Sequence, residues 1–336
     1  MHSKLTIDSS IHSYTIEFIN TIEVIQDLMK EPNTISIVDS NVARLYPELK
    51  DGIIVEATEK AKTLEGAEEL LTKLSERRAN VKTKLIVIGG GIIQDLAGFC
   101  ASVYARGIEY ILIPTTLLAQ ADSCVGGKTS INLRSKKNLI GTFYPPSKIL
   151  IYKEFLNTLT RTDYISGLGE IYKFNILQNN IEQFDLSRDI LEMIYEGLSY
   201  KISILKKDEF DKNERRFLNY GHTFGHAIET TSNNNIPHGL AVILGSMIAI
   251  RISKYLGYDI PNYDMILNNG VKLIRESQIQ LEKDWFNLED LLEIVKSDKK
   301  STGKLTMVLM DKEPFLKNID DTEVIRTALN ETYESI

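Results

Sequence analysis

The side chains best able to do chemistry gather in the segment 215–226. Arg215, Asn219, His222 and His226 follow the spacing i, i+4, i+7 and i+11, so a single helix through the segment would place them in one narrow stripe. Burying a guanidinium, an amide and two imidazoles without partners costs free energy, which makes this stripe a poor core face. The spacing therefore predicts one wall of a cavity that holds a metal ion and an anion.

The histidines offer more than one way to bind a metal. His222 and His226 are one helical turn apart, as in helical zinc pairs, and His238 is a third candidate ligand. Three of the five histidines fall within residues 222–238, although a lone histidine is usually structural. Together with Glu170, two of these imidazoles would form a site that keeps one coordination position open for a substrate hydroxyl.

Two lysines have both an ordinary and a functional explanation. Glu170 and Lys173 lie three residues apart, and this spacing alone favours a surface ion pair worth a few tenths of a kcal/mol. The alternative is that Glu170 binds the metal and Lys173 faces the same pocket. Lys201 lies in the apolar stripe of its helix, beside Leu198 and Leu205. It therefore either extends to water or points into a polar cleft.

Glycine-rich turns in the first half of the chain are candidates for anion binding. Gly89, Gly90 and Gly91 follow a predicted strand and open a predicted helix, which lets backbone N–H groups approach a pyrophosphate. A plain tight turn explains these glycines equally well. Asp39, at the end of an earlier strand, would accept a ribose hydroxyl or cap a helix. Lys128 follows two glycines, and we expect it to bind an anion.

The elements that must position these residues change character along the chain. Short apolar runs alternate with helical periodicity in the first half, and long helical segments follow about residue 160. This pattern predicts a parallel α/β sheet and then a helical domain, with the boundary near residues 157–163. The predicted strands are residues 34–38, 84–88, 110–114 and 149–152. The predicted helices are residues 66–78, 95–104, 167–178, 190–206, 215–231, 240–255 and 288–296.

The bulk composition narrows the classes of partner. The 336 residues carry a formal net charge of −7, which disfavours nucleic acid because a phosphate backbone rewards a basic surface. No apolar run approaches the roughly 18 residues that a membrane-spanning helix needs. The first residues lack the layout of a signal peptide. Cys100 and Cys124 show neither metal spacing nor a disulfide framework, so we expect a cytoplasmic protein.

Over residues 39–300 the chain resembles the 3-dehydroquinate synthase family, within the sugar-phosphate cyclase group. Several motifs carry this resemblance together, and their combination is far more specific than any one of them. They lie at residues 89–99, 106–108, 114–129, 137–144, 167–173, 218–229 and 238–239. The resemblance implies an NAD-binding α/β domain over residues 1–160, an all-α metal- and substrate-binding domain over residues 161–336, and a homodimer.

The resemblance also implies roles for individual residues. It assigns a zinc or cobalt ion to Glu170, His222 and His238, and it moves His226 from the metal to the substrate phosphate. The implied NAD contacts are Asp39, Glu59, Lys62, Gly91, Asp95, Thr115, Thr116, Lys128, Lys137, Phe155 and Thr158. The implied substrate contacts are Asp122, Lys128, Asn138, Lys173, Lys201, Arg215 and Asn219. Phosphate contacts are also implied for Arg106, reached from a second subunit, and for Lys299 or Lys300.

The implied reaction converts 3-deoxy-D-arabino-heptulosonate 7-phosphate (DAHP) into 3-dehydroquinate and phosphate, a lyase step of the shikimate pathway in aromatic amino acid biosynthesis. NAD+ takes the C5 hydride beside a metal that acidifies vicinal hydroxyls, and phosphate then leaves by β-elimination. The hydride returns, the ring opens, and an aldol step closes the carbocycle. Arg215 suits the substrate carboxylate because its planar fork binds one bidentately. Arg215 and Lys201 together favour DAHP over sugar phosphates that lack a carboxylate.

Some residues depart from the family pattern and leave alternatives open. Leu240 stands where the family usually has Glu, and losing that carboxylate is expected to change how His238 is oriented. Gln94 and Ser130 replace frequent glycines, and Thr160 replaces a common proline. These departures leave room for a related cyclase that acts on an amino-substituted or other substrate. A metal-dependent polyol dehydrogenase of the same fold and a catalytically dead sugar-phosphate sensor are further alternatives.

Overall fold

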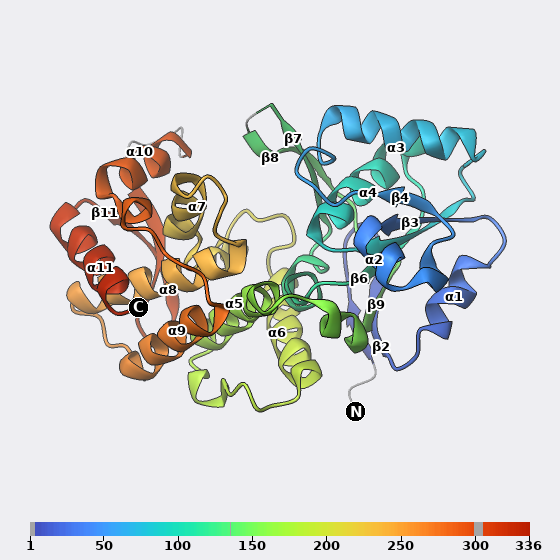
Figure 1. Cartoon of the computed structure of the whole chain (residues 1–336). Coiled ribbons are helices and arrows are strands. Elements are labelled where there is room, and N and C mark those ends of the chain that lie inside the picture. Colours follow the sequence, from blue (N-terminus) through green and yellow to red (C-terminus); the bar gives the residue numbers. More distant parts are fainter. Residues whose placement is uncertain (1–3, 135, 299–304) are drawn as a thin grey trace. The chain divides into compact units, whose positions relative to one another are not determined.

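The chain forms two compact units, one ending at Leu159 and the other starting at Thr160. Figure 1 labels most of their helices and strands. The computed structural model describes residues 4–134, 136–298 and 305–336. Within these ranges no helix is long and apolar enough to cross a membrane.

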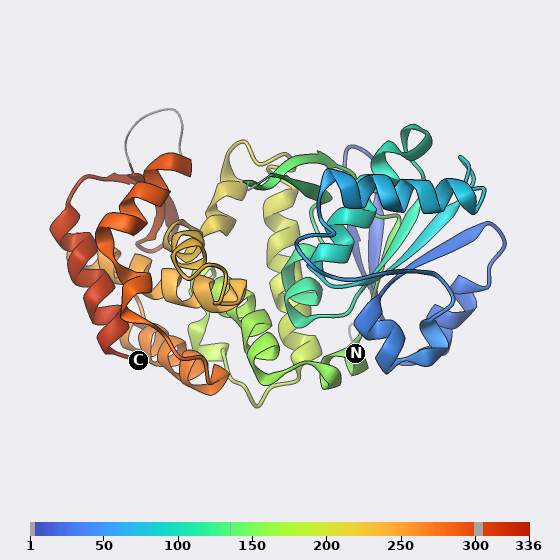
Figure 2. The ribbon, with the colours of Figure 1, turned by 45° about the horizontal axis from the view of Figure 1, so that its top comes forward.

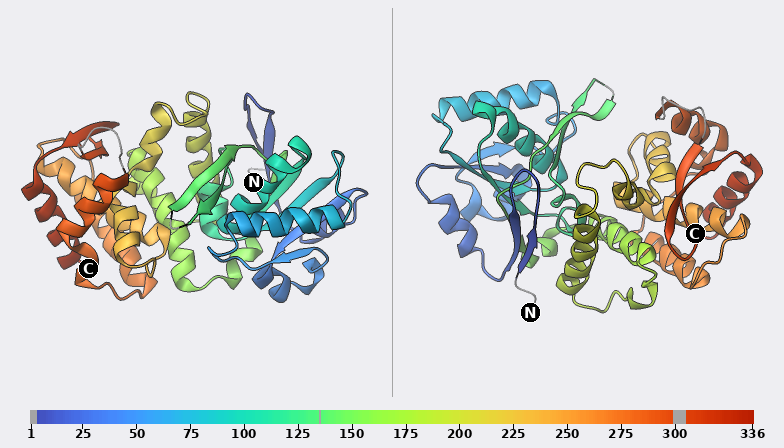
Figure 3. Two further views of the ribbon diagram at one scale, coloured as in Figure 1. Left: turned by 90° about the horizontal axis from the view of Figure 1, so that it is seen from above. Right: turned by 180° about the vertical axis from the view of Figure 1, so that it is seen from behind.

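The first unit is built on a seven-stranded sheet in the order β1-β2-β9-β6-β5-β3-β4. Its strands are parallel except β1, which pairs antiparallel with β2 at one edge (Figure 3). The four predicted strands are confirmed as β3, β5, β6 and β9. The bounds are β1 Lys4–Ile7, β2 Tyr14–Ile19, β3 Thr34–Asp39, β4 Ile53–Val55, β5 Lys84–Gly89, β6 Tyr110–Pro114 and β9 Lys148–Tyr152.

Helices cover both faces of this sheet, as the predicted α/β fold requires. Figure 2 shows α1 (Glu23–Met29) and α2 (Ser40–Leu45) on one side, with α3 (Leu64–Glu76) and α4 (Gly91–Val103) on the other. Buried aliphatic side chains of β3, β5 and β6 form the core beneath α1 and α2. This burial on both faces explains why the central strands are continuous apolar runs.

A separate antiparallel hairpin follows β6 along the chain. Its strands are β7 (Lys128–Leu133) and β8 (Lys136–Phe143), and β7 packs against α4. The hairpin, which begins at Lys128, therefore lies against α4, the helix that the glycine turn opens.

The second unit is mainly helical, as predicted, and also contains an antiparallel hairpin of β10 and β11. Helix α8 is buried along most of its length and packs against α5, α7, α9 and α11 (Figure 1). The bounds are α5 Arg161–Leu177, α6 Ile190–Leu205, α7 His222–Thr231, α8 His238–Tyr255, α9 Tyr263–Ser277, α10 Leu288–Asp298, β10 Leu305–Met310, β11 Pro314–Ile319 and α11 Thr322–Glu334. Short helical segments of other types lie at Pro47–Leu49, Tyr104–Arg106, Ala119–Ser123, Lys153–Thr158, Ile181–Gln183, Glu214–Asn219 and Lys283–Phe286.

The prediction of one continuous helix over residues 215–231 is wrong. A short 3-10 helix spans Glu214–Asn219, and α7 begins only at His222. The break lies at Gly221, whose φ of 77° is left-handed. A Cβ atom there would lie 2.4 Å from Ser246 Oγ on α8, so close packing against α8 requires glycine. The four-residue stripe therefore splits into two elements with different directions.

Candidate active site

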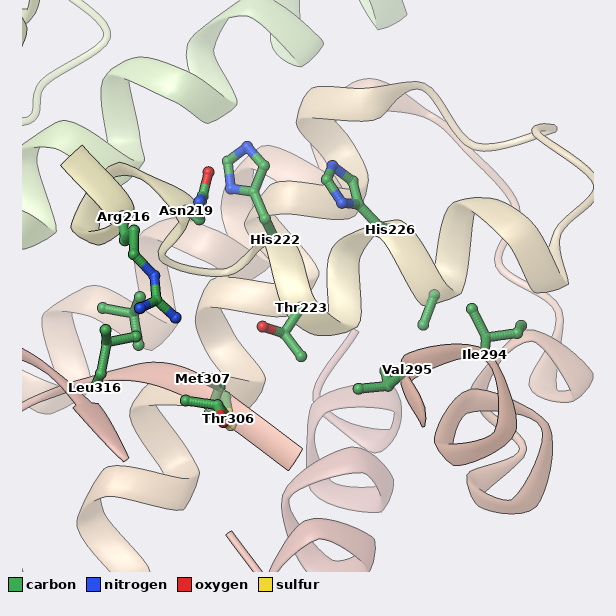
Figure 4. Close-up of a pocket in the computed structure, with 12 residues that line it drawn as sticks. Arg216, Asn219, His222, Thr223, His226, Ile294, Val295, Thr306, Met307 and Leu316 are labelled. Carbon is green, nitrogen blue, oxygen red and sulfur yellow. The ribbon is translucent and has the colours of Figure 1, made fainter. Parts of the chain in front are cut away.

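A buried carboxylate and two imidazoles converge in the second unit. The distance from Glu170 Oε1 to His238 Nε2 is 3.3 Å, and the distance to His222 Nε2 is 3.7 Å. The ligand atoms of His222, His226 and His238 all lie within 4.8 Å of one another. Figure 4 shows His222 and His226 leaving α7 one turn apart. The structure thus brings together the carboxylate and all three candidate histidines.

Close backbone packing creates this convergence. A Cβ atom at Gly169 would lie 2.2 Å from the carbonyl oxygen of Gly239, and a Cβ atom at Gly239 would lie 1.7 Å from the carbonyl oxygen of Ser166. These distances leave no room for a side chain, so α5 and α8 touch backbone to backbone. Because Glu170 follows Gly169 and His238 precedes Gly239, the contact places both functional side chains at the same helix crossing.

The spacing of the donor atoms fits a divalent metal ion. In a tetrahedral site with bonds of about 2.1 Å, ligand atoms lie about 3.4 Å apart. The separations of 3.3 and 3.7 Å from Glu170 Oε1 to the two Nε2 atoms are close to this value. Glu170 Oε1 is buried and forms no hydrogen bond within the described ranges, so a bound cation would satisfy it.

The two imidazoles nearest Glu170 are oriented through their other nitrogen. His222 Nδ1 lies 3.0 Å from the carbonyl oxygen of Tyr220, and His238 Nδ1 lies 3.0 Å from Glu229 Oε2. Both partners accept hydrogen bonds, so the neutral rings carry the proton on Nδ1. The lone pair on Nε2 then faces Glu170, as a metal ligand requires.

Electrostatics fix the protonation of the ligand set. Burial raises the pKa of Glu170, but Lys173 and the two histidines outweigh burial and hold that pKa well below its ordinary value. Burial and Lys173 lower the pKa of His222 well below its ordinary value, which keeps this ring neutral. Burial also lowers the pKa of His238, but Glu170 and Glu229 outweigh it and raise the pKa to about 10. His238 must therefore lose a proton before it can bind a cation.

The prediction that Glu170 and Lys173 form a surface pair is wrong. Both side chains are only 1% exposed, and the Lys173 ammonium contacts Glu170 Oε2. The centre of α5 is buried on all sides, which spacing along one helix cannot reveal. Breaking a buried pair by removing one partner costs about 3–5 kcal/mol, so Lys173 is tied firmly to the candidate metal ligand.

Other predicted substrate residues of the second unit differ in exposure. Lys201 and Arg215 are buried, at 6% and 4% exposed, whereas Asn219 is exposed. The Arg215 guanidinium donates to the carbonyl oxygen of Glu209, and its backbone N–H donates to Asp208 Oδ2 over 3.0 Å. Both Lys299 and Lys300 lie outside the described residues.

A pocket of about 240 Å³ lies beside α7 and brings three predicted residues together (Figure 4). Asn219, His222 and His226 line it with Thr223 and Arg216. Arg216 was not singled out from the sequence, because its neighbour Arg215 carries the expected spacing to Asn219. The pocket is closed by residues of α10, β10 and β11, so the unpredicted hairpin supplies part of this wall.

In the first unit, predicted cofactor residues gather at the carboxyl ends of parallel strands, the edge where open α/β sheets bind dinucleotides. Asp39 ends β3, and its side chain caps α2 by accepting from the backbone N–H of Asn41 over 2.8 Å. Asp39 therefore caps a helix, which is one of the two roles that the sequence offered for it. Gly91 opens α4 directly after β5, confirming the glycine turn. The others follow β6 or β9 along the chain: Thr115, Thr116, Phe155 and Thr158.

A buried lysine links the glycine-turn helix to the β7–β8 hairpin. Lys62 is 5% exposed, and it pairs with Asp95 and donates to Asn138 Oδ1 over 2.6 Å. Burial raises the pKa of Asp95, and Lys62 opposes that shift. Ser130 adds hydrogen bonds of 3.2 Å to Asp95 and 3.0 Å to Asn138. The serine that replaces a frequent glycine thus joins the network.

A second set of contacts holds the tip of the same hairpin. Asn132 Nδ2 donates to Glu59 Oε2 over 2.6 Å, and Asn132 Oδ1 accepts from the backbone N–H of Asn138 over 2.9 Å. Lys137 lies 3.8 Å from Glu59. Asn132 was not predicted, because its place in the sequence gives no sign of its partners. It ties a predicted cofactor residue to a predicted substrate residue.

Three predicted residues of the first unit lie outside the network around Lys62 and Asn132. Lys128 is exposed at the start of β7, and Asp122 is half-buried in the turn Ala119–Ser123. Arg106 is exposed, and its φ of 68° follows a φ of 49° at Ala105. Left-handed backbone at two consecutive non-glycine residues is strained. The structure gives Arg106 no contact with the network around Lys62 among the described residues.

Known proteins resemble this chain along nearly its whole length. The family models described as 3-dehydroquinate synthase N-terminal and 3-dehydroquinate synthase C-terminal match residues 52–166 and 167–301. The 3-dehydroquinate synthase of Dictyoglomus turgidum is 36% identical over 330 residues, covering 93% of this chain and 88% of that protein. The enzyme of Dictyoglomus thermophilum is 37% identical over 335 residues, covering 94% and 88%. A solved 2-deoxy-scyllo-inosose synthase, complexed with carbaglucose-6-phosphate, NAD+ and Co2+, matches with a TM-score of 0.80 at 24% identity, covering 98% of this chain and 100% of that one.

Proposed function

The chain belongs to the 3-dehydroquinate synthase family, and we propose that it converts DAHP into 3-dehydroquinate and phosphate with catalytic NAD+ and a divalent metal ion. One observation carries this proposal more than any other. Glu170, His222 and His238 come from three helices and present donor atoms at the spacing of a tetrahedral metal site. A hydroxyl-bearing substrate needs such a site with an open position.

The two bound groups divide the chemistry. When bound, NAD+ accepts and returns a hydride while Zn2+ or Co2+ acidifies the substrate hydroxyl that it binds. We assign the metal to Glu170, His222 and His238. We assign NAD+ to the strand-end residues of the first unit and to the network around Lys62. The buried Lys62 ammonium holds Asp95 and Asn138 in one arrangement before any ligand arrives.

The chain's own cations suit an anionic substrate. The Glu209 carbonyl group holds the Arg215 guanidinium, whose planar fork suits a carboxylate. Lys201 is buried on α6 and would add a second positive charge there. We assign the phosphate to Lys128, Asn138, Asn219 and His226, with Arg106 reaching it from a second subunit.

Lys173 has a different part in this scheme. Its ammonium contacts the Glu170 oxygen that does not face the histidines, so it keeps the carboxylate ionised and orients Oε1 toward the metal. The same ammonium would help to stabilise negative charge that develops on a substrate hydroxyl beside Glu170.

We further propose that the protein works as a homodimer in the cytoplasm. Cys100 and Cys124 are both buried free thiols, which suits a reducing compartment. The proposed substrate is a small phosphorylated keto acid, and neither a nucleic acid nor a membrane is a proposed partner.

The decisive experiment incubates the purified protein with DAHP, NAD+ and Zn2+. Inorganic phosphate should appear with no net NADH, because the hydride returns to the substrate. Parallel reactions contain glycerol or a sugar phosphate without a carboxylate. NADH formed from glycerol would support the polyol dehydrogenase, and phosphate released from the second compound would support a related cyclase. No observation on this chain favours either alternative. Binding of DAHP without turnover would support the sensor.

A further inference from the structure

We propose that Glu229 is a positioning residue that holds His238 in the tautomer and orientation needed to bind the metal ion. This inference rests on the proposed function, because it takes Glu170, His222 and His238 as the metal ligands. It also identifies which carboxylate contacts His238 in a chain that has Leu at position 240.

The imidazole of His238 lies between two carboxylates. Its Nδ1 atom is 3.0 Å from Glu229 Oε2, and its Nε2 atom is 3.3 Å from Glu170 Oε1. An ionised carboxylate can only accept hydrogen bonds. A neutral His238 ring therefore places its proton on Nδ1, toward Glu229, and turns its Nε2 lone pair toward Glu170 and the metal position.

Glu229 reaches His238 because of its place on α7. His222, His226 and Glu229 have the spacing i, i+4 and i+7, so they share one face of the helix. After α7 the chain turns at residues 232–237 and starts α8 at His238. The Glu229 side chain is only 16% exposed, so water competes weakly for its carboxylate. One helix thus supplies two imidazoles and the carboxylate that orients the third.

Leu240 cannot orient His238. It lies two residues further along α8, about 200° around the helix axis, so its side chain leaves the helix on the far side from His238. Leu240 is also completely buried, at 0% exposed. The departure from the family pattern at this position therefore does not remove the partner of His238 Nδ1, which is Glu229 of α7.

The partner of His238 is chemically distinct from the partner of His222. His222 Nδ1 faces a backbone carbonyl oxygen, that of Tyr220, which no substitution of a side chain removes. The partner of His238 is a charged side chain, so it can be changed without touching a metal ligand. Outer partners of this kind typically change metal affinity by about 10- to 100-fold when mutated.

The test uses full-length metal-free protein and two substitutions. Glu229→Gln keeps the shape but removes the charge, and its amide can present either a donor or an acceptor to Nδ1. Glu229→Ala removes the contact. The matched control is Glu196→Gln on α6, which removes the charge of a carboxylate that pairs with Arg188 at 2.6 Å. Affinities for Co2+ and Zn2+ are measured by competition with a chromophoric chelator, and the visible spectrum of bound Co2+ reports its coordination geometry.

We expect both Glu229 variants to bind Co2+ and Zn2+ about 10- to 100-fold more weakly, with an altered Co2+ spectrum. The metal-free variants should remain folded at the assay temperature, and the Glu196→Gln control should match wild type. Wild-type affinity and spectrum in both Glu229 variants would overturn the inference. So would a loss of affinity that appears only with unfolding of the metal-free protein. If wild-type protein fails to turn over DAHP but the Glu229 variants still lose Co2+, the proposed reaction fails and this inference stands.

Discussion

Replacing Gly221 with alanine should lower the free energy of unfolding of the second unit more than replacing Gly257, another left-handed glycine of that unit. Gly221 has a φ of 77° and separates the turn that carries Asn219 from the helix that carries His222. A Cβ atom there would lie 2.4 Å from Ser246 Oγ and 2.9 Å from Ser246 N. The backbone nitrogen cannot move away without shifting α8, so the clash cannot be relieved by a side-chain rotation alone.

The expected loss in free energy of unfolding on Gly221→Ala has two parts, which a control substitution can separate. Left-handed backbone costs a non-glycine residue about 1–2 kcal/mol, and overpacking a core costs about 1–3 kcal/mol. Gly257, in the same unit, has a φ of 84° but nothing within 4 Å of its Cβ position. Gly257→Ala should therefore lower the free energy of unfolding by about 1–2 kcal/mol. Gly221→Ala should lower it by about 2–5 kcal/mol, the two parts together.

Urea unfolding of the metal-free protein, followed by circular dichroism, measures both variants. The loss of unfolded-chain entropy on replacing glycine is common to both and cancels in their comparison. Metal affinity gives a second measurement, because moving the backbone at Gly221 moves His222. Equal destabilisation by the two substitutions would refute the argument that α8 packing demands this glycine. Unchanged metal affinity in a destabilised Gly221→Ala protein would refute the link to the metal site.

Three further predictions address other parts of the chain. Burial raises the pKa of Asp208, but three backbone N–H groups outweigh burial and lower that pKa below its ordinary value of 3.8. The ionised carboxylate therefore stabilises the fold fully above pH 3.8, and this stabilisation is lost as the pH falls through the lowered pKa of the folded state. Asp208→Asn should cost about 1.5–3 kcal/mol at pH 7, and the difference from wild type in acid titrations should shrink below about pH 4; a constant difference would contradict this. Lys62→Met should destabilise the first unit by about 1.5–3 kcal/mol and weaken NAD+ binding in calorimetry, since Asp95 and Asn138 lose their shared cation; unchanged NAD+ affinity would exclude the network from the cofactor site. Chelation should abolish phosphate release without changing the far-UV circular dichroism, because the ligands lie on helices packed independently of the ion, and added Co2+ should restore activity.

Strands that are covered by helices on both faces of the sheet could be predicted well from the sequence. β5 and β6 are apolar over their whole length because helices cover both sides of the sheet. The short edge strand Ile53–Val55 and the N-terminal pair β1 and β2 have no such run, and only their pairing with neighbours defines them. The hairpin of β10 and β11 lies within a helical unit, where the short apolar run of β10 does not by itself distinguish a strand from a buried helical segment.

The single long helix through Arg215 and His226 shows what spacing cannot reveal. The i, i+4, i+7 and i+11 pattern is real, but it is interrupted at Gly221 by packing against α8, a helix that follows later in the chain. A glycine inside a helical pattern is compatible with both outcomes. The choice is made by tertiary contact, so no local rule could have decided it.

The convergence of Glu170 with His238 has the same origin. Nothing in the sequence alone states that Gly169 and Gly239 touch, yet that contact sets the separation of their functional neighbours. The resemblance to a known family implied that Glu170 and His238 are metal ligands, whereas spacing favoured a surface pair for Glu170 and Lys173. Family resemblance carries tertiary information that periodicity lacks, which is why it grouped Glu170 with His222 and His238 where local reasoning favoured a surface pair.

The charge of the site resolves an apparent conflict between an acidic protein and an anionic substrate. The chain carries a net charge of −7, but a substrate within the site responds mainly to groups closer than the Debye length of about 8 Å. Around the metal position, Glu170 and Glu229 bring two negative charges, and Lys173 and the protonated His238 bring two positive charges. A divalent cation that displaces the His238 proton turns this balanced charge into a net positive one. The loaded site should therefore attract a phosphorylated keto acid more strongly than the metal-free site, so metal binding should strengthen DAHP binding even where no metal–substrate bond forms.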